Sequence, residues 1–387
     1  MSAWPTVALV DVLEGHQVSY GIVQPGNDFS AGIPIVRVKD VRNGLIDTRS
    51  PMKVHPSISQ NHSRTVLRGG ELLMTLVGTV GEVAVAPSSL AGWNVARAIA
   101  VIRSDSVSSA WLKLCIESPV AKAQVGALLN TTVQWTLNLS DLKTIQIAMP
   151  PHRDRVAIAE VLGALDDKIA ANVRLLETLD LLTSNVFQSM LGRSSEIPLS
   201  ATAEFVNGKA FTKGASGTGR VVVRIAELNS GIGASTVYSD AEVEDKYVAF
   251  PGTLLFAWSG SLTMHRWFRV PAIINQHIFK VIPKDGYPMW LVHELLRGKL
   301  EFFKSTAADK ATTMGHIQRR HLDELVSVPA QSEIDSHSVL MTSLWDLALA
   351  AECENESLAA TRDALLPQFM SGKLRVRDGE ENLEVAR

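Results

Sequence analysis

The chain carries the stretch VAIAEVLGALDDKIAANVRLLETLDLLTSNVFQSM at residues 156–190. It contains no proline, and Gly163 is its only glycine. Large aliphatic residues recur every seven positions at Leu162, Ile169 and Leu176. Because a seven-residue apolar repeat is typical of helices that pair with one another, the stretch predicts a long coiled-coil helix.

The same pattern returns in the last part of the chain, on a stripe that contains Leu344 and Leu358. In this register the polar Asn172 corresponds to Glu354, and a polar residue in a coiled-coil core can fix register or orientation. A helix of about 35–39 residues spans roughly 50–60 Å, which is more than the core of a small domain needs. We therefore expect two long helices that pair antiparallel and hold two globular parts apart.

The chain also repeats itself outside the helices, which indicates duplicated domains. Ile35–Gly44 recurs as Val222–Gly231, and Gly70–Leu73 recurs at nearly the same spacing as Gly252–Leu255. Three shorter correspondences keep the same order: Trp93-Asn94 with Ile274-Asn275, Thr131-Thr132 with Thr312-Thr313, and Ile145–Met149 with Leu325–Val328.

The repeated blocks predict a mixed architecture in each half. Short apolar runs bounded by glycine favour buried strands, and Asn43-Gly44 and Ser230-Gly231 favour turns. Apolar residues at three- and four-residue steps predict helices at Ala110–Val125 and Pro288–Phe303. We expect an α+β fold in which two β-rich globular domains alternate with two long helices, as an internal pseudo-twofold repeat.

Composition places the chain among ordinary globular proteins. Its 387 residues are 46% hydrophobic and 20% charged, which excludes a wholly disordered chain. Residues 1–151 have a net charge of +2 and residues 193–330 of +3, whereas residues 152–192 have −2 and residues 331–387 have −6. The two cysteines are far apart, so neither a disulfide framework nor a cysteine-based zinc site is expected. The sequence has no membrane-spanning run, and a cytoplasmic protein is expected.

Several segments together resemble one family. They are Trp4–Leu9, Ile197–Leu199, Leu67–Leu73 with Glu71 in place of the family's aspartate, Ile273–His277 with its Asn-Gln-His sequence, and Met149–Pro151 followed by Ile158–Leu162 and Leu165–Ile169. In their order, spacing and duplication they resemble the specificity (S) subunits of type I restriction–modification systems. The family's Leu-x-Glu-Gln after the double proline is replaced here by His152–Arg155.

The resemblance implies a domain organisation that covers the whole chain. It assigns residues 1–151 and 193–330 to two target-recognition domains, residues 152–192 and 331–372 to two conserved long helices, and residues 373–387 to a mobile tail. Residues expected in the helix seam or at partner contacts are Leu162, Leu165, Ile169, Leu176, Leu179, Val186, Phe187, Leu344, Leu347 and Leu358.

The resemblance also implies that each domain reads a few base pairs of a split, asymmetric DNA target. Base edges are read by polar and basic side chains, so the candidates lie in polar loops beside the repeated strands. In the first half they are Lys39, Arg42, Arg64, Thr79, Arg97, Thr131, Thr132, Gln134 and Trp135. In the second half they are Arg220, Asn229, Ser261, His265, Arg266, Thr312, Thr313, His316, Gln318 and Arg319.

The expected partners are double-stranded DNA, two adenine-N6 methyltransferase (M) subunits and two restriction (R) subunits, with no membrane. The chain itself has no Asp-Pro-Pro-Tyr segment, no phosphate-binding Gly-x-x-x-x-Gly-Lys loop and no His-Glu-x-x-His. No catalytic residue, metal or cofactor is therefore expected in it, and S-adenosylmethionine, ATP and Mg²⁺ would be used by the partners.

Three other interpretations stay open at this point. A coiled-coil scaffold could bind proteins at its globular ends, and a methylation-only system could use the same subunit without a nuclease. A hydrolase using one of the histidines is the third, although no paired nucleophile and base stands out.

Overall fold

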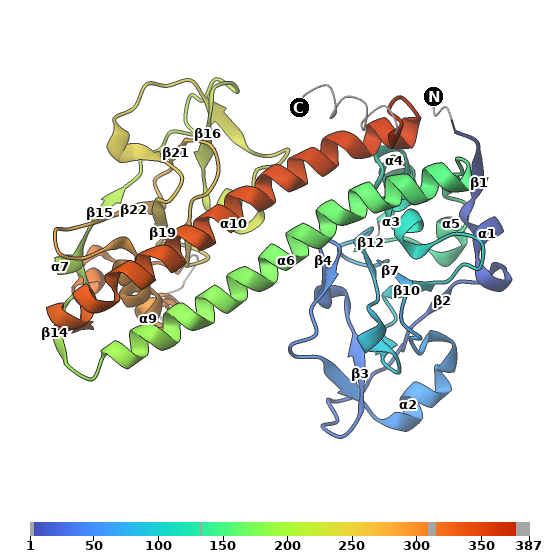
Figure 1. Cartoon of the computed structure of the whole chain (residues 1–387), viewed down its shortest axis with the longest axis horizontal. Coiled ribbons are helices and arrows are strands. Elements are labelled where there is room, and N and C mark those ends of the chain that lie inside the picture. The colour runs from blue at the N-terminus through green and yellow to red at the C-terminus, as the bar shows by residue number, and fades with distance from the viewer. Residues whose placement is uncertain (1–3, 132–133, 309–314, 377–387) are drawn as a thin grey trace. The chain divides into compact units, whose positions relative to one another are not determined.

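The computed structural model describes residues 4–131, 134–308 and 315–376, and these form two compact units (Figure 1). Unit 1 contains the described residues up to Ala170 and from Leu358 onward, and unit 2 contains Ala171–Ser357. Two long helices, α6 (His152–Met190) and α10 (Gln331–Ser371), contribute one part to each unit. Each unit therefore consists of a globular domain and a section of the helix pair.

The two long helices run antiparallel in both units. In unit 1, Leu162 near the start of α6 shares a core with Leu366 and Phe369 near the end of α10. In unit 2, Phe187 near the end of α6 shares a core with Met341 near the start of α10. The predicted antiparallel pair is confirmed.

A polar contact lies inside this helix pair. Asn172 of α6 is 3% exposed, and its Nδ2 donates to Glu354 Oε2 at 2.7 Å and to Asn355 Oδ1 at 3.0 Å. Sequence periodicity placed Asn172 and Glu354 at equivalent positions of the two repeats. Residues at the same position of the two helical repeats therefore meet within unit 2.

The predicted seam residues differ in burial. Leu162, Leu179, Phe187 and Leu344 are buried, and Leu165, Ile169, Leu176, Val186 and Leu358 are half-buried. Leu347 instead is 46% exposed, and Leu344, Ala348 and Ala351 form the buried stripe of α10. The physical reason is that successive residues of an α-helix are about 100° apart, which places Leu347 at the margin of the face that Leu344, Ala348 and Ala351 bury.

The domain of unit 1 is built on a four-stranded antiparallel sheet with the order β2-β10-β7-β8. Its strands are β2 (Ser19–Tyr20), β10 (Ile99–Ile102), β7 (Leu72–Thr75) and β8 (Val83–Val85). A second sheet pairs β3 (Ile33–Val36) antiparallel with β6 (Met52–Val54) and parallel with β9 (Asn94–Val95). Smaller pairs are β1 (Thr6–Ala8) with β13 (Gln146–Ala148), β4 (Val41–Arg42) with β5 (Leu45–Ile46), and β11 (Asn130–Thr131) with β12 (Trp135–Thr136).

The domain of unit 2 repeats this plan. Its antiparallel sheet has the order β15-β22-β19-β20, with strands β15 (Ala203–Asn207), β22 (Ile278–Pro283), β19 (Leu254–Ala257) and β20 (Thr263–Arg266). A second sheet has the order β17-β16-β21-β18, with strands β17 (Val237–Ser239), β16 (Arg220–Val223), β21 (Ala272–Ile274) and β18 (Val248–Ala249). Strand β14 (Ser194–Pro198) pairs with β23 (Leu325–Pro329). In both domains the one parallel pair described, β3–β9 or β16–β21, joins the equivalent strands.

Helices cover these sheets. Unit 1 has α1 (Leu9–Val12), α2 (Pro56–Asn61), α3 (Ser109–Glu117), α4 (Pro119–Leu128) and α5 (Leu139–Leu142), and unit 2 has α7 (Leu199–Thr202), α8 (Ile225–Ser230) and α9 (Met289–Ala308). The helix predicted at Ala110–Val125 is two helices, because Ser118 before Pro119 is extended. The Ser118 hydroxyl caps α4 by accepting from Ala121 N.

The two predicted turns have different outcomes. Asn43 and Gly44 both have positive φ, of 51° and 77°, and connect β4 to β5 as a tight hairpin turn. Ser230 instead ends α8, and Gly231 with φ 78° follows it at the helix end. Within the described ranges no helix is both long and apolar enough to cross a membrane.

Candidate nucleic-acid interface

Three segments of unit 1 meet where strand β7 ends. Leu76 N donates to Ala98 O in the β9–β10 connection at 2.8 Å, and Leu137 N after β12 donates to Leu76 O at 2.9 Å. Gly78 N donates to Trp135 O in β12 at 3.0 Å. The loop between β7 and β8 is therefore held between two other loops, and we call this arrangement the unit 1 edge.

The same three segments meet in unit 2. Trp258 N after β19 donates to His277 O at 3.2 Å, Ile317 N donates to Trp258 O at 3.0 Å, and Gly260 N donates to Gly315 O at 2.8 Å. This unit 2 edge reproduces the backbone hydrogen bonds of the unit 1 edge with different side chains.

Several predicted DNA-contacting residues lie together on the unit 1 edge. Thr79, Arg97 and Gln134 are exposed, and the Trp135 side chain is 54% exposed. Thr131 lies in β11, which pairs with β12 at Trp135. A tryptophan this exposed is unusual in a folded domain, and with a neighbouring arginine it suits contact with a ligand rather than packing. Thr132 lies outside the described residues.

The unit 2 edge brings together Ser261, His316 and Gln318, all of which are exposed. The Trp258 ring lies 6.4 Å from the ring of His316 and 5.5 Å from that of His277. Thr312 and Thr313 lie outside the described residues. Trp258 was not among the predicted candidates, although it directly follows a strand that the sequence repeat had found.

The structure changes one correspondence between the repeats. Asn94 was paired with Asn275, but the isolated parallel bridges Ile22–Ala96 and Lys209–Asn275 make Ala96 the counterpart of Asn275. Ile99 N donates to Ala96 O just as Ile278 N donates to Asn275 O. The Asn94–Asn275 pairing is therefore wrong, because the second copy is shorter between β19 and β21 than the first copy is between β7 and β9.

The two asparagines accordingly have different surroundings. Asn94 is fully buried and satisfied, since its Oδ1 accepts from Thr65 Oγ1 at 2.7 Å and its Nδ2 donates to Ser59 Oγ at 3.1 Å. In the part of the chain that the structure describes, Asn275 Oδ1, Gln276 Oε1 and His277 Nδ1 are buried and have no hydrogen-bond partner. Buried unpaired polar groups are costly, and a run of three indicates a place where water or a ligand completes the hydrogen bonds. Gln276 is the counterpart of Arg97.

Glycine carries the signal that could have aligned the repeats correctly. A Cβ on Gly21 would lie 2.0 Å from Val95 O, and a Cβ on Gly208 would lie 2.2 Å from Asn275 O. Each glycine approaches the equivalent backbone segment in its own domain. The number of residues from Gly21 to Gly208 equals the number from Ile35 to Val222, the first residues of the first repeated block. Only glycine fits such a close backbone approach.

Other candidates of unit 1 lie outside the three segments that form the edge. Lys39 and Arg42 are exposed, in a short 3₁₀ turn (Val38–Asp40) and in strand β4. The hairpin that carries Arg42 contacts the β7–β8 loop, because Asn43 N donates to Glu82 Oε2 at 3.0 Å. Arg64 is exposed in another 3₁₀ turn (Ser63–Thr65) and lines a separate polar pocket of about 400 Å³.

The remaining candidates of unit 2 fall into three places. Arg220 is half-buried in β16 and donates to Ala241 O at 2.9 Å, and Asn229 is exposed on α8. Arg319, in a 3₁₀ turn (Arg319–Asp323), lines a pocket of about 390 Å³ that also contains Lys284. These residues do not join the unit 2 edge.

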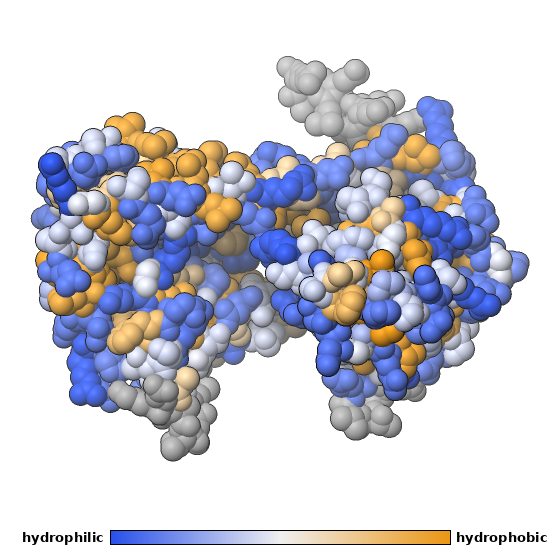
Figure 2. Space-filling view, turned by 90° about the horizontal axis from the view of Figure 1, so that it is seen from below, coloured by the Kyte–Doolittle hydropathy of each residue, from blue (hydrophilic) through white to orange (hydrophobic). Residues whose placement is uncertain are grey.

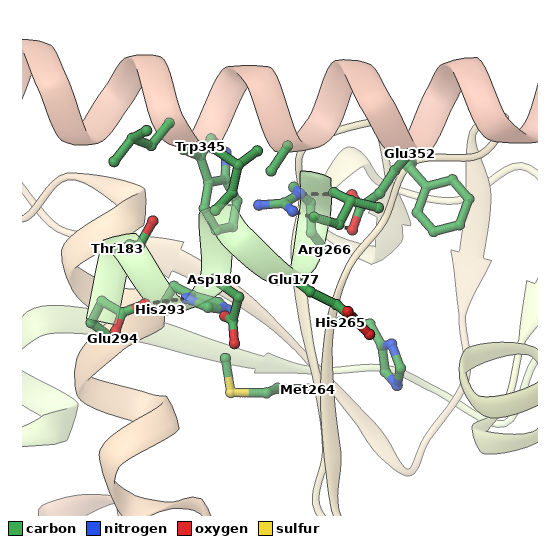
Figure 3. A pocket seen from close by; sticks show the side chains of 15 residues that line it. Glu177, Asp180, Thr183, Met264, His265, Arg266, His293, Glu294, Trp345 and Glu352 are labelled. Atoms are coloured by element: carbon green, nitrogen blue, oxygen red, sulfur yellow. Dashed lines mark hydrogen bonds and ion pairs between the residues drawn. The ribbon is translucent and has the colours of Figure 1, made fainter. Parts of the chain in front are cut away.

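His265 and Arg266 lie on β20 and line a third pocket in unit 2, of about 360 Å³ (Figure 3). Arg266 Nε donates to Glu352 Oε2 of α10 at 2.7 Å, and its guanidinium lies 4.4 Å from the centre of the Trp345 ring. The pKa of His265 is lowered by burial and by the nearby positive charge of Arg269. The geometry therefore gives Arg266 a partner on the long helix, and His265 is disfavoured as a cationic contact.

Glu71, which replaces the family's aspartate, lies inside unit 1 and is 4% exposed. It accepts hydrogen bonds from Arg68 N at 2.6 Å and Gly69 N at 2.8 Å, and it pairs with Arg103 at 2.9 Å. Burial raises its pKa, but these hydrogen bonds outweigh burial and leave the pKa below its ordinary value. This carboxylate stabilises the turn before β7.

Comparisons with known proteins agree with this duplicated architecture. Residues 1–181 match the family model described as the type I restriction modification DNA specificity domain. The type I restriction enzyme EcoBI specificity subunit of Escherichia coli is 28% identical over 204 residues, which are 51% of this chain and 42% of that subunit. The match thus spans less than half of that relative's length.

A solved structure shares the fold over nearly the whole chain. The S subunit of a type I restriction–modification system from M. genitalium gives a TM-score of 0.56 at 13% identity and covers 95% of this chain and 96% of that one. At this identity the likeness concerns the fold alone. Residues 1–181 thus have the features of a type I specificity domain. Over these ranges the chain is similar to the specificity subunits of type I restriction–modification systems, in line with the sequence resemblance.

Proposed function

We propose that the chain is the non-catalytic DNA-specificity subunit of a type I restriction–modification complex. In this proposal its two domains read the two parts of a split, asymmetric DNA target in the cytoplasm. The observation that carries it is the duplicated edge: equivalent backbone hydrogen bonds in the two units present different polar side chains. One frame with two sets of side chains suits recognition of two different half-sites.

The side chains on the edges have the chemistry of base readout. Arg97 is exposed on the unit 1 edge, where an arginine can donate two hydrogen bonds to guanine. Gln276 takes the equivalent position on the unit 2 edge, and glutamine is the usual partner of adenine. The two half-sites are therefore expected to differ at the base pair that this position contacts.

The modest charge of the domains bears on affinity. Net charges of +2 for residues 1–151 and +3 for residues 193–330 are small for proteins that neutralise many phosphates. We therefore propose that methyltransferase subunits supply part of the contact with the DNA backbone. Binding by the isolated chain should be weak and should decrease steeply as salt is raised from about 50 to 200 mM. Tight, salt-resistant binding by the chain alone would contradict this division of labour.

The long helices offer a surface for those subunits. On the unit 2 section, Leu181 is 66% exposed, Val339 is 81% exposed and Leu340 is 47% exposed. Apolar areas reach the surface in Figure 2 as well. Aliphatic residues at the surface of a helix pair offer apolar area that a protein partner can cover. We propose that two M subunits dock on the helices, that two R subunits join them, and that these partners use S-adenosylmethionine, ATP and Mg²⁺.

The test is to map N6-methyladenine in DNA from cells that express this chain with its neighbouring methyltransferase, and in cells that lack this chain. Methylation at one bipartite motif, present only with the chain, is the expected result. If the methyltransferase is expressed and no chain-dependent motif appears, DNA recognition is contradicted and a protein-binding scaffold is favoured. Restriction of incoming unmethylated DNA then separates a full system from a methylation-only one.

A further inference from the structure

Charged side chains join the domain of unit 1 to α6, and α6 to α10, through one carboxylate. Lys113 of α3 is 8% exposed, and its Nζ donates to Asp166 Oδ2 of α6 at 2.5 Å and to Glu117 at 3.0 Å. Arg362 of α10 donates to the other oxygen of Asp166 at 2.9 Å. One carboxylate thus contacts the domain helix and the second long helix at the same time.

The electrostatics of this cluster keep Asp166 charged. Burial raises its pKa, but Lys113 and Arg362 together lower the pKa below its ordinary value. Burial lowers the pKa of Arg362, and its hydrogen bonds to Asp166 and Asp363 raise the pKa by more. The contact is therefore between groups that are charged at neutral pH, and such hydrogen bonds are short and directional.

The domain of unit 2 is tied to the helices by two separate contacts. Arg266 of β20 donates to both oxygens of Glu352 on α10, at 2.7 and 3.2 Å, and stacks on Trp345 of the same helix (Figure 3). Arg297 of α9 donates to Asp180 of α6 at 2.6 Å. The domain of unit 2 therefore has ionic contacts with both α6 and α10, whereas the domain of unit 1 contacts Asp166 of α6, which also pairs with Arg362 of α10.

Apolar packing alone would hold the domains less specifically. Each domain shares one continuous apolar core with its section of the helix pair. The hydrophobic effect is non-directional. It brings the domain and the helices into contact, but it controls their relative orientation only weakly. Bidentate and buried ion pairs fix direction, because removing one partner leaves a buried charge unpaired.

We propose that Asp166 and Glu352 are positioning residues that fix the orientation of each recognition domain on the helices and so set the spacer length accepted between the half-sites. The inference rests on the proposed function. One added base pair displaces a half-site by about 3.4 Å and turns it by about 35° around the DNA axis. A domain held in one orientation rejects this change, and a domain that can turn tolerates it.

The experiment uses the full chain with its methyltransferase and a set of DNA targets that carry the native half-sites. Their spacers have the native length or differ from it by one base pair. The variants are Asp166→Asn and Glu352→Gln, which keep side-chain size and remove the charge. Lys246→Met, which breaks the exposed Lys246–Glu244 pair, is the control. Methylation of each altered spacer relative to the native spacer should rise about fivefold in either variant and stay unchanged in the control.

A charge exchange tests the mechanism directly. The double variant Arg266→Glu with Glu352→Arg restores an ion pair with the two charges exchanged. This variant should return the spacer preference toward that of the unaltered chain. Unchanged spacer preference in both single variants would overturn the inference while leaving the proposed function intact. Absence of chain-dependent methylation on every target, with the unaltered chain, would instead overturn the proposed function.

Discussion

The turn before β7 in unit 1 and the turn before β19 in unit 2 have the same hydrogen-bond pattern and different chemistry. In the first, Arg68 N donates to the carboxylate of Glu71 at 2.6 Å. In the second, Phe250 N donates to the hydroxyl of Thr253 at 3.0 Å. Donor and acceptor take equivalent positions in the two copies of the repeat. The repeats thus preserve a backbone donor and an oxygen acceptor, while the residue that supplies the oxygen is free to change.

The two edges follow the same rule. Arg97 in unit 1 and Gln276 in unit 2 take equivalent positions, and so do backbone contacts of Trp135 and Gly315. What is preserved is the backbone frame with its close glycine contacts, and what differs is the surface it presents. Three experiments test whether the frame is shared and the surfaces are independent.

The largest effect is expected at the glycines that both frames share. Gly21→Ala and Gly208→Ala would each place a Cβ at 2.0–2.2 Å from a backbone oxygen. The strands must separate to relieve this contact, so each variant should lose about 3 kcal/mol of unfolding free energy. Denaturant unfolding of the full chain measures the loss. Gly163→Ala, in open space on α6, is the control and should gain about 0.5–1 kcal/mol. Equal stability of all three variants would contradict a shared frame.

A smaller and one-sided effect is expected at the edges. Arg97→Ala should relax base preference by about 1–3 kcal/mol at one half-site only, because a bidentate contact to a base is lost. His316→Ala should relax the other half-site. The measurement is methylation of a library in which each half-site is randomised in turn. Arg49→Ala, which removes an exposed ion pair with Asp47 in the same domain, should change neither. Relaxation of both half-sites by one variant would refute independent reading.

The smallest effect concerns acid. Because the pKa of Glu71 is lowered in the folded chain, its stabilisation is complete above about pH 4.5 and is lost as pH falls through the folded pKa. Thr253 at the equivalent position does not titrate. Glu71→Thr should therefore be less stable than the unaltered chain at pH 6, and the difference should shrink at pH 3.5. Denaturant unfolding at both pH values measures it, and a difference independent of pH would show that the carboxylate charge is not what stabilises the turn.

Much of the architecture could be predicted from local pattern. The seven-residue stripes identified both long helices, and the polar position at Asn172 identified its contact with Glu354, because coiled-coil geometry depends on sequence period alone. The prediction was wrong at Leu347, which lies at the margin of the buried face of α10.

The edges were predicted only in part. Thr79, Arg97 and Trp135 could be predicted because they lie next to repeated strands. Trp258 could not, because an aromatic residue in an apolar run is typical of a hydrophobic core. Arg266 was expected on DNA, and the structure gives it a carboxylate on α10, a contact between residues far apart in the sequence. Contacts between residues so far apart in the sequence produce no periodic pattern that could predict them. The assignment of individual base contacts stays a prediction.

The contact between Asn172 and Glu354 has a consequence for the evolution of the chain. In a symmetric dimer of a half-length protein, each residue on the axis would meet its own copy, so a glutamate there would face a glutamate and an asparagine would face an asparagine. Here the two copies lie on one polypeptide, and an amide donor meets a carboxylate acceptor at 2.7 Å. In a fused chain each copy of the repeat can mutate independently. A substitution that improves one domain therefore does not have to occur in the other domain as well.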